Sequence, residues 1–407
     1  MRKWLALLGL FILALFVSPA QSALLATPYT LVTNNSGQAQ PVLDGATGQP
    51  VYIGDQPWTM APGETIISHA WGDYPRYVYG GHSYHYMGSI GGSNFRFFVV
   101  PDWPQRLFMA NYYVWFDPDT FTNQYVSDLP ANPYNSDDPV VMARHVDQAK
   151  SVGIDAFVTA WLGPGNRTDR NFTRLLEVAQ GKGFQVTISF QMHMLPNQTQ
   201  EEITAALRYI ANNYSGHPAF LRYQGRPVLV FTDMPRVPTA PDQIPHDAWQ
   251  NIRQQVDPTG AWIWIAEGLD PSYLKVFDGL YVLKIDHRDF PDDYVKLPRW
   301  GQRVRSWATT LGQPKFWMAT IQPGWDDTRS ADQPGGMRIP SPPFARDREG
   351  GAYYSRTFDY AIRSQPDWLL LHSFNEWVEG SMIEPSVSYG DLYLNMTQDF
   401  AQRFKGG

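Results

Sequence analysis

The sequence contains no cysteine among its 407 residues, which excludes disulfides, a thiolate nucleophile and any cysteine-based metal site. It has no long lysine or arginine run, and its 32 basic against 39 acidic residues give a net charge of −7. Without a basic patch to hold phosphates, nucleic acid is not expected as a partner. A phosphate-binding glycine loop is also missing, which counts against a transferase that uses nucleotide sugars. No repeat of fixed period is visible, which disfavours a solenoid or a propeller.

Aromatic residues, by contrast, are abundant. They make up 14% of the chain, with 15 tryptophans and 22 tyrosines, and the hydrophobic fraction is 43%. A chain of this length and composition can bury one large core together with a smaller attached unit. Flat amphipathic rings suit both core packing and the apolar faces of sugars.

The N-terminus has the pattern of a signal peptide, which we assign to residues 1–23. Arg2 and Lys3 precede an apolar run from Trp4 to Val17, and small residues follow up to Ala23. An uncleaved membrane anchor is the alternative, but the apolar run is shorter than the ~20 residues that a spanning helix needs. We therefore expect a secreted, periplasmic or cell-envelope protein, with no transmembrane domain beyond the signal segment.

Residues 24–105 consist of short β-like runs, such as Tyr29–Thr33 and Phe95–Val100, separated by glycine, proline and asparagine. We predict a small β-rich accessory segment here.

From residue 106 to residue 407, apolar strand-like runs alternate with amphipathic helical stretches, which is typical of βα units around a parallel sheet. Eight such runs are present, the number that a closed barrel requires. The sequence therefore predicts an α/β fold, a (β/α)₈ TIM barrel. The predicted strands are Leu107–Trp115, Ala156–Trp161, Gln185–Phe190, Pro227–Phe231, Ala261–Ala266, Gly279–Lys284, Lys315–Ile321 and Trp368–Ser373.

The catalytic residues of such a barrel come from the C-terminal ends of its strands. Directly after the last strand stand Glu376 and Glu379, which places two acids on one short turn at the barrel mouth. Glycoside cleavage needs one acid to protonate the departing oxygen and a second group to attack or to stabilise the sugar cation. Capping of a helix N-terminus is the other interpretation of these glutamates. Aromatic residues at the neighbouring strand ends favour catalysis.

Other strand ends supply candidate substrate-binding residues, each with a structural alternative. Trp161 and Trp325 are candidates to stack on sugar rings; the alternative is that both belong to the core. Asp326 and Asp327 would bind sugar hydroxyls or form an Asx turn. Paired aspartates also suit a cation, but no third ligand follows at a fixed spacing, so we predict no metal.

Three further candidates come from tyrosine and histidine. Tyr112 and Tyr113 are neighbours on one strand and point to opposite faces, so at most one of them faces the barrel mouth. His217 precedes a proline, which favours a helix end. It would contact a sugar hydroxyl or cap that end.

The run Ser373–Pro385 resembles the S-F-N-E-W-H-E-G-T-x-I-E-P motif of glycoside hydrolase family 99. The resemblance extends from about Arg106 to the C-terminus and does not cover the accessory segment. It adds Asn375, Trp377 and Glu384 to the substrate-binding candidates. Further matching segments, in order, are Ala110–Tyr113, Asn135–Pro139, Trp161–Gly165, Tyr214–Phe220, Gly225–Pro227 and Pro323–Arg329.

The resemblance implies an endo-acting α-mannosidase or α-mannanase that retains anomeric configuration without a metal or other cofactor. It also implies that Glu376 acts as a general base on the sugar's own 2-hydroxyl, giving a 1,2-anhydro sugar, and that Glu379 is the general acid and base. In the alternative double displacement, Glu376 attacks carbon and the carboxyl groups lie ~5–5.5 Å apart. The sequence leaves both routes open.

Two departures from the family pattern concern the substrate. Val378 stands where the motif has histidine, and Gln191, which we keep as a binding candidate, stands near the glutamate of an F-H-I-E-P segment. Loss of an ionisable contact changes sugar discrimination, so the predicted partner is an α-linked polysaccharide or glycan, with mannose as one candidate sugar. A non-catalytic glycan-binding or polysaccharide-assembly protein is the competing interpretation. The oligomeric state is not indicated.

Overall fold

A computed structural model describes residues 106–122, 124–192, 199–330 and 342–406, together with the strands before residue 101. The chain divides into two compact units, one of Met1–Pro104 with Arg305–Pro314 and one of Gln105–Val304 with Lys315–Gly407. The limits that we predict for the signal peptide, the accessory segment and the barrel domain stay predictions.

The N-terminal strands form one eight-stranded sheet and one two-stranded sheet, so this part of the chain is β-rich, as expected. The order of the larger sheet is β1-β2-β7-β8-β9-β10-β4-β5, and β3 pairs with β6. The strands are β1 (Leu10–Ile12), β2 (Tyr29–Asn34), β3 (Gln40–Pro41), β4 (Tyr52–Ile53), β5 (Gln56–Pro57), β6 (Thr59–Met60), β7 (Thr65–Trp71), β8 (Tyr74–Tyr79), β9 (His82–Met87) and β10 (Arg96–Val100).

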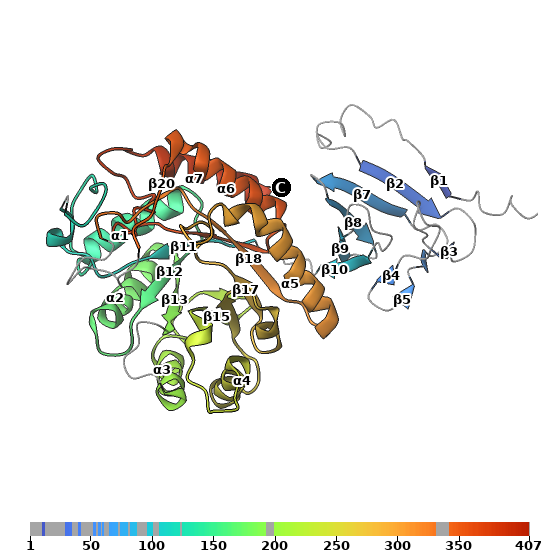
Figure 1. Cartoon of the computed structure of the whole chain (residues 1–407), viewed down its shortest axis with the longest axis horizontal. Helices are drawn as coiled ribbons and strands as arrows, with labels where there is room; N and C mark the ends of the chain where they lie inside the picture. Colours follow the sequence, from blue (N-terminus) through green and yellow to red (C-terminus); the bar gives the residue numbers. More distant parts are fainter. Residues whose placement is uncertain are drawn as a thin grey trace, which may run out of the picture. The chain divides into compact units, whose positions relative to one another are not determined.

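Eight parallel strands form a closed barrel, which confirms the predicted (β/α)₈ fold (Figure 1). Each strand pairs with the next in sequence; β21 pairs with β11 and closes the ring, and the short β14 (Arg222–Tyr223) adds to β15 in antiparallel fashion. The barrel strands are β11 (Phe108–Tyr112), β12 (Ala156–Trp161), β13 (Gln185–Gln191), β15 (Arg226–Thr232), β16 (Ile263–Glu267), β17 (Gly279–Tyr281), β18 (Phe316–Ile321) and β21 (Trp368–Leu371).

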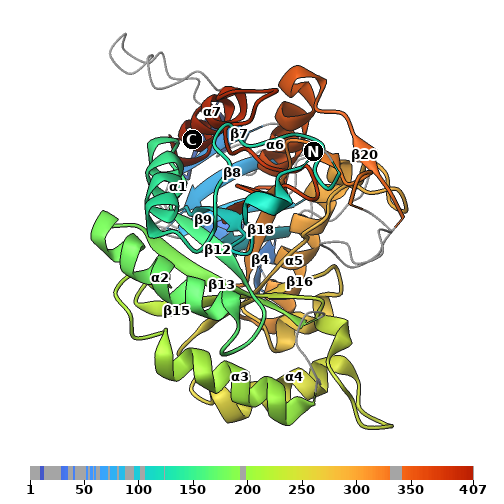
Figure 2. The ribbon, with the colours of Figure 1, turned by 90° about the vertical axis from the view of Figure 1, so that its left-hand side faces the viewer.

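Helices pack outside the strands, and α3 and α4 lie side by side along one flank (Figures 1 and 2). Their starts follow local capping rules: Asp138 accepts a hydrogen bond from the Val140 amide, and Thr199 and Glu202 form a capping box. The helices are α1 (Pro139–Ser151), α2 (Arg167–Lys182), α3 (Gln200–Asn213), α4 (Pro245–Val256), α5 (Leu297–Leu311), α6 (Ala352–Arg363) and α7 (Leu392–Gly406).

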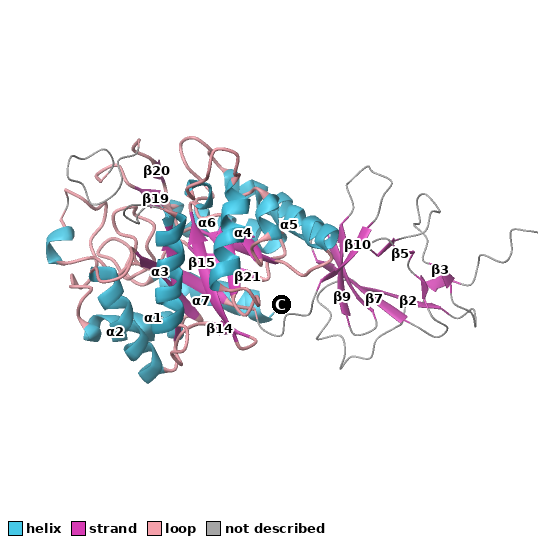
Figure 3. Ribbon diagram, turned by 90° about the horizontal axis from the view of Figure 1, so that it is seen from below, coloured by secondary structure: helices cyan, strands magenta, loops and turns pink. Residues whose placement is uncertain are grey.

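Short elements shape the loops of the barrel. The hairpin of β19 (Trp325–Asp326) and β20 (Ala345–Arg346) lies among the loops shown in pink in Figure 3. The 3₁₀ helices are η2 (Pro118–Thr120), η4 (Met234–Arg236), η5 (Pro271–Lys275), η6 (Asp293–Lys296) and η7 (Glu349–Gly351).

The two ends of the barrel interior differ in polarity. At the end where the strands begin, Phe316 stacks on Trp368 with 4.2 Å between ring centroids, and Tyr223 packs against both. At the end where the strands finish, the register places polar side chains on the same inner face. These are Asn111, Ser189, Gln191, Thr232 and Glu267. Aromatic side chains therefore fill the end of the barrel where the strands begin, and polar side chains line the end where the strands finish, which we call the barrel mouth.

Candidate active site

The turn after β21 is tied to the end of β11 by hydrogen bonds. The Phe374 amide donates to the Asn111 carbonyl at 2.9 Å. The Asn375 side chain pairs with the backbone of Tyr113, accepting from its amide at 2.8 Å and donating to its carbonyl at 2.9 Å. Asn375, a predicted substrate contact, thus holds the turn that carries both glutamates.

Glu376 and Glu379 occupy different environments on this turn. Glu376 is 2% exposed, its amide donates to the Ser373 hydroxyl at 2.7 Å, and its Oε1 accepts from the Val378 amide at 3.3 Å. The Glu379 side chain is 15% exposed. Two carboxyl groups in unequal surroundings can take different roles in one reaction.

The Glu379 carboxyl is contacted from two sides. Its Oε2 lies 3.1 Å from Nε2 of the buried His372, and its Oε1 lies 3.7 Å from Nζ of Lys284. Lys284 also lies over the Trp325 ring, 4.8 Å from its centroid.

Tyr113 is the tyrosine that lies beside the turn that carries Glu376 and Glu379. Burial raises the pKa of its hydroxyl well above the usual value, and the negative charges of Glu376 and then Glu379 raise it further. The phenol therefore stays protonated and can donate a hydrogen bond.

Glu267, at the end of β16, brings a third carboxyl to the barrel mouth. Burial is the main cause that raises its pKa, and the nearby Asp233 carboxylate adds to the effect. The Asp233 amide, which donates to Glu267 Oε2 at 2.9 Å, and the charge of Lys284 oppose it. An acid with a raised pKa at a strand end is a further candidate site residue.

Glu384 is the centre of a buried network below the turn. Its Oε2 accepts from the Tyr134 hydroxyl at 3.0 Å and from Trp377 Nε1 at 2.9 Å. Its Oε1 lies 2.9 Å from His145 Nε2, and the other ring nitrogen of His145 is 2.9 Å from the Tyr112 hydroxyl. The polar atoms of three predicted substrate contacts, Tyr112, Trp377 and Glu384, are thus used inside the protein.

Residues 99–400, most of the chain, match glycosyl hydrolase family 99. The chain belongs to this family. Membership confirms the resemblance found in the motifs and the predicted enzyme class, glycoside hydrolase.

Similar proteins include the glycoprotein endo-alpha-1,2-mannosidase-like proteins of human (26% identity over 318 residues) and mouse (25% over 315). The mouse glycoprotein endo-alpha-1,2-mannosidase is 25% identical over 325 residues. Each comparison covers 70% of this chain and 66%, 66% and 65% of those relatives, so the chain matches slightly less than two thirds of their length.

Solved structures support the fold. The GH99 endo-alpha-mannosidase of Bacteroides thetaiotaomicron superposes with a TM-score of 0.61 at 22% identity, covering 74% of this chain and 97% of that one. A glycoside hydrolase-like protein superposes with a TM-score of 0.52 at 16% identity, covering 72% and 93%.

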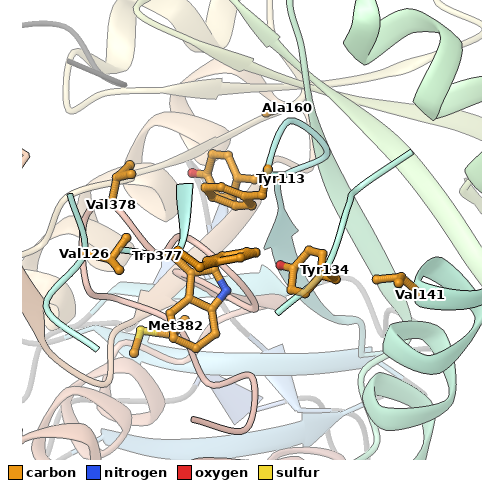
Figure 4. Packing of buried hydrophobic residues seen from close by; sticks show 10 residues of the cluster. Tyr113, Val126, Tyr134, Val141, Ala160, Trp377, Val378 and Met382 are labelled. Carbon is orange, nitrogen blue, oxygen red and sulfur yellow. The ribbon is translucent and has the colours of Figure 1, made fainter. Parts of the chain in front are cut away.

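Val378, which replaces the histidine of the family motif, lies in a buried apolar cluster beneath the turn. Figure 4 shows Trp377 near the middle of this cluster, with Tyr113 and Met382 among its neighbours. Position 378 therefore belongs to packed core in this chain, where a valine is well accommodated. Of the two departures from the family pattern, only Gln191, the last residue of β13, lies on the inner face at the barrel mouth.

Both candidate tryptophans are buried. Trp161 donates from Nε1 to Asp169 at 2.8 Å. Trp325 is 1% exposed and stacks on His372 with 5.6 Å between centroids and 20° between planes. These positions agree with the core alternative, and sugar stacking by either ring stays a prediction.

The candidate aspartates organise the loop after β18. Asp326 accepts hydrogen bonds from the Thr328 amide and hydroxyl at 3.1 and 2.6 Å, which is the Asx-turn geometry. The Asp326 amide donates to the Glu379 carbonyl at 2.8 Å. Asp327 is buried and accepts from the Phe344 amide at 2.7 Å.

His217 is not brought to the barrel mouth. The chain just after it bonds to Val186, near the start of β13, so His217 lies at the opposite end of the barrel from Glu376. Its Nδ1 accepts from the Ala219 amide at 3.2 Å, as a capping side chain does.

Sequence reasoning did not assign roles to His372, Lys284, Asn111 or Glu267. Asn111 and Glu267 carried a usable signal, since both are polar residues at inward positions of strand ends. His372 and Lys284 also lie in the last two positions of predicted strands, but their contact with Glu379 depends on how the turn folds back, which local sequence does not show. Within the described ranges, no three histidine or acidic side chains cluster as metal ligands would.

Proposed function

We propose that this protein is an exported, retaining, endo-acting glycoside hydrolase that cleaves α-linked, mannose-containing polysaccharide or glycan. The observation that carries the proposal is the unequal pair of acids on one turn at the barrel mouth. Glu376 is buried beside Tyr113, and Glu379 is partly exposed between His372 and Lys284.

In the proposed first step, the Glu376 carboxylate takes the proton of the sugar 2-hydroxyl, and that oxygen attacks the anomeric carbon. The glycosidic bond breaks as Glu379 protonates the departing oxygen. In the second step, Glu379 takes a proton from water, which opens the 1,2-anhydro ring, and Glu376 returns its proton to O2. Two inversions at the same carbon give net retention. The partial exposure of Glu379 suits a group that must meet both leaving group and water.

The substrate class rests on the relatives, whose names describe endo-acting α-1,2-mannosidases. Gln191 supplies an uncharged amide at the barrel mouth, near where the family carries a glutamate. We expect this residue to adjust which sugar is accepted, because an unpaired or altered polar contact changes discrimination strongly.

Export rests on the N-terminal pattern of a basic start, an apolar run and small residues. None of the helices in the part of the chain that the structure covers combines the length and apolar character needed to cross a bilayer.

The test is hydrolysis of α-mannan, α-glucan and envelope polysaccharides by the purified protein without residues 1–23, followed by reducing-sugar release and product chromatography. We expect oligosaccharide release from an α-mannosidic substrate. Glu376→Gln and Glu379→Gln should each lower turnover by roughly 100-fold or more with unchanged melting temperature. Glu201→Gln, on the exposed start of α3, is the matched control. Near wild-type turnover in both catalytic variants would overturn the proposal.

A further inference from the structure

His372 is held on three sides at the junction between β21 and the catalytic turn. Its Nε2 lies 3.1 Å from Glu379 Oε2, and its Nδ1 lies 3.1 Å from the Asn111 amide nitrogen. The indole of Trp325 stacks on the imidazole. The family motif begins one residue later, at Ser373, and gives His372 no role.

The contact with Asn111 selects one protonation form of the ring. An amide nitrogen only donates hydrogen bonds, so His372 Nδ1 must accept and its proton resides on Nε2. That proton points at Glu379 Oε2. A neutral imidazole therefore donates to the carboxyl, and Asn111 fixes the direction of the bond.

The charged and titratable groups around Glu379 act on different atoms. Lys284, which follows β17, lies near Oε1, whereas His372 contacts Oε2. Glu376 is on the same turn, and the charges of both glutamates act on the hydroxyl of Tyr113, the residue after β11. With each carboxyl oxygen contacted by a separate group, rotation of this partly exposed side chain is restricted, and a fixed orientation favours proton transfer.

We infer that His372 is a positioning residue for Glu379: its Nε2–H, directed by Asn111, holds the carboxyl in the orientation for proton transfer. The inference rests on the proposed role of Glu379 as general acid and base. Where the family motif places a histidine between the two glutamates, this chain has Val378 inside the apolar cluster. The imidazole that contacts Glu379 in this chain is that of His372, directly after β21.

The first test needs no substrate. Long-range ¹H–¹⁵N spectra of protein labelled in histidine report which ring nitrogen carries the proton. We expect a neutral Nε2–H form for the resonance that disappears in His372→Gln, and we expect that resonance to move in Glu379→Gln. A neutral Nδ1–H form, or a cationic ring at neutral pH, would overturn the inference.

The second test compares two replacements of similar size. His372→Gln keeps an N–H donor within reach of Glu379, whereas His372→Met fills the space without one. We expect His372→Met to lower kcat by roughly 10- to 100-fold with little change in KM, and His372→Gln to recover most of that loss. His246→Gln, on the outer helix α4, controls for loss of a histidine elsewhere.

The outcomes separate this inference from the proposed function. If Glu379→Gln lowers turnover but His372→Met does not, the inference fails and the proposed function stands. If neither glutamate matters for turnover, the proposed function fails, and the spectra still decide whether the Nε2–H bond exists. Equal losses in the Gln and Met variants at equal melting temperature would also reject the inference, because restoring the donor would then have no effect.

Discussion

Replacement of Glu384 tests whether this buried acid supports the turn that carries Glu376 and Glu379 or binds substrate. The carboxylate accepts hydrogen bonds from Tyr134 and Trp377 and pairs with His145, all in the interior. Glu384→Leu leaves these donors without their acceptor. Each buried donor left without its acceptor costs about 1–3 kcal/mol, so we expect the loss of these three contacts to lower the free energy of unfolding by about 3 kcal/mol or more.

Glu384→Gln is the matched variant because it can keep every partner. Its carbonyl can accept from Trp377 and Tyr134, and its amide nitrogen can donate to His145. The His145 proton then moves to Nδ1 and is donated to the Tyr112 hydroxyl oxygen. The expected loss is about 1–2 kcal/mol, the value of weakened but satisfied hydrogen bonds.

The assay is urea unfolding followed by tryptophan fluorescence and near-UV circular dichroism, with linear extrapolation of the free energy of unfolding. Comparable losses in the free energy of unfolding of the Leu and Gln variants would show that the glutamine does not keep its partners through a shift of the His145 proton. Wild-type stability in Glu384→Leu together with a raised KM would show that Glu384 contacts substrate directly.

Four further outcomes follow from the site and its surroundings. Lys284→Met should raise the pKa of Glu267 further, because the ammonium charge lowers it in the native protein; carboxyl ¹³C titration measures this shift, and an unchanged value would contradict it. EDTA should leave activity unchanged, and a loss restored by one cation would reveal a metal requirement. An activated 2-fluoro sugar should form no covalent adduct, whereas a mass increase mapped to Glu376 would favour double displacement over the anhydro-sugar route. Burial lowers the pKa of Lys315 to about 8, so the folded state binds fewer protons than the unfolded state between pH 8 and 10. The free energy of unfolding should rise by up to about 3 kcal/mol over that pH window in the wild-type protein, and this rise should be absent in Lys315→Met. Urea unfolding at a series of pH values measures both.

The sequence by itself determined the barrel and placed Glu376 and Glu379, the acids that we propose as catalytic, directly after its last strand. Eight apolar runs of strand length, all but the fifth followed by a helical pattern, allow few arrangements other than a closed parallel sheet. The strand ends were less accurate: the run predicted to reach Lys284 ends as a strand at Tyr281. The Thr320 hydroxyl donates a hydrogen bond to the Val282 carbonyl, so a side-chain donor takes the place of a backbone donor from the neighbouring strand. Such an exchange of partners is not visible in local sequence.

Only the tertiary structure decided which polar side chains face the barrel mouth and which serve the protein interior. Glu376, Tyr113 and Gln191 sit at the mouth because strand alternation and the return of the turn onto β11 place them there. Glu384 has the same residue type as Glu376, yet its oxygens are taken by donors from segments up to 250 residues away. Local pattern specifies strands and turns, but the hydrogen-bond partners of a buried polar group come from distant chain segments, so their identity follows from packing.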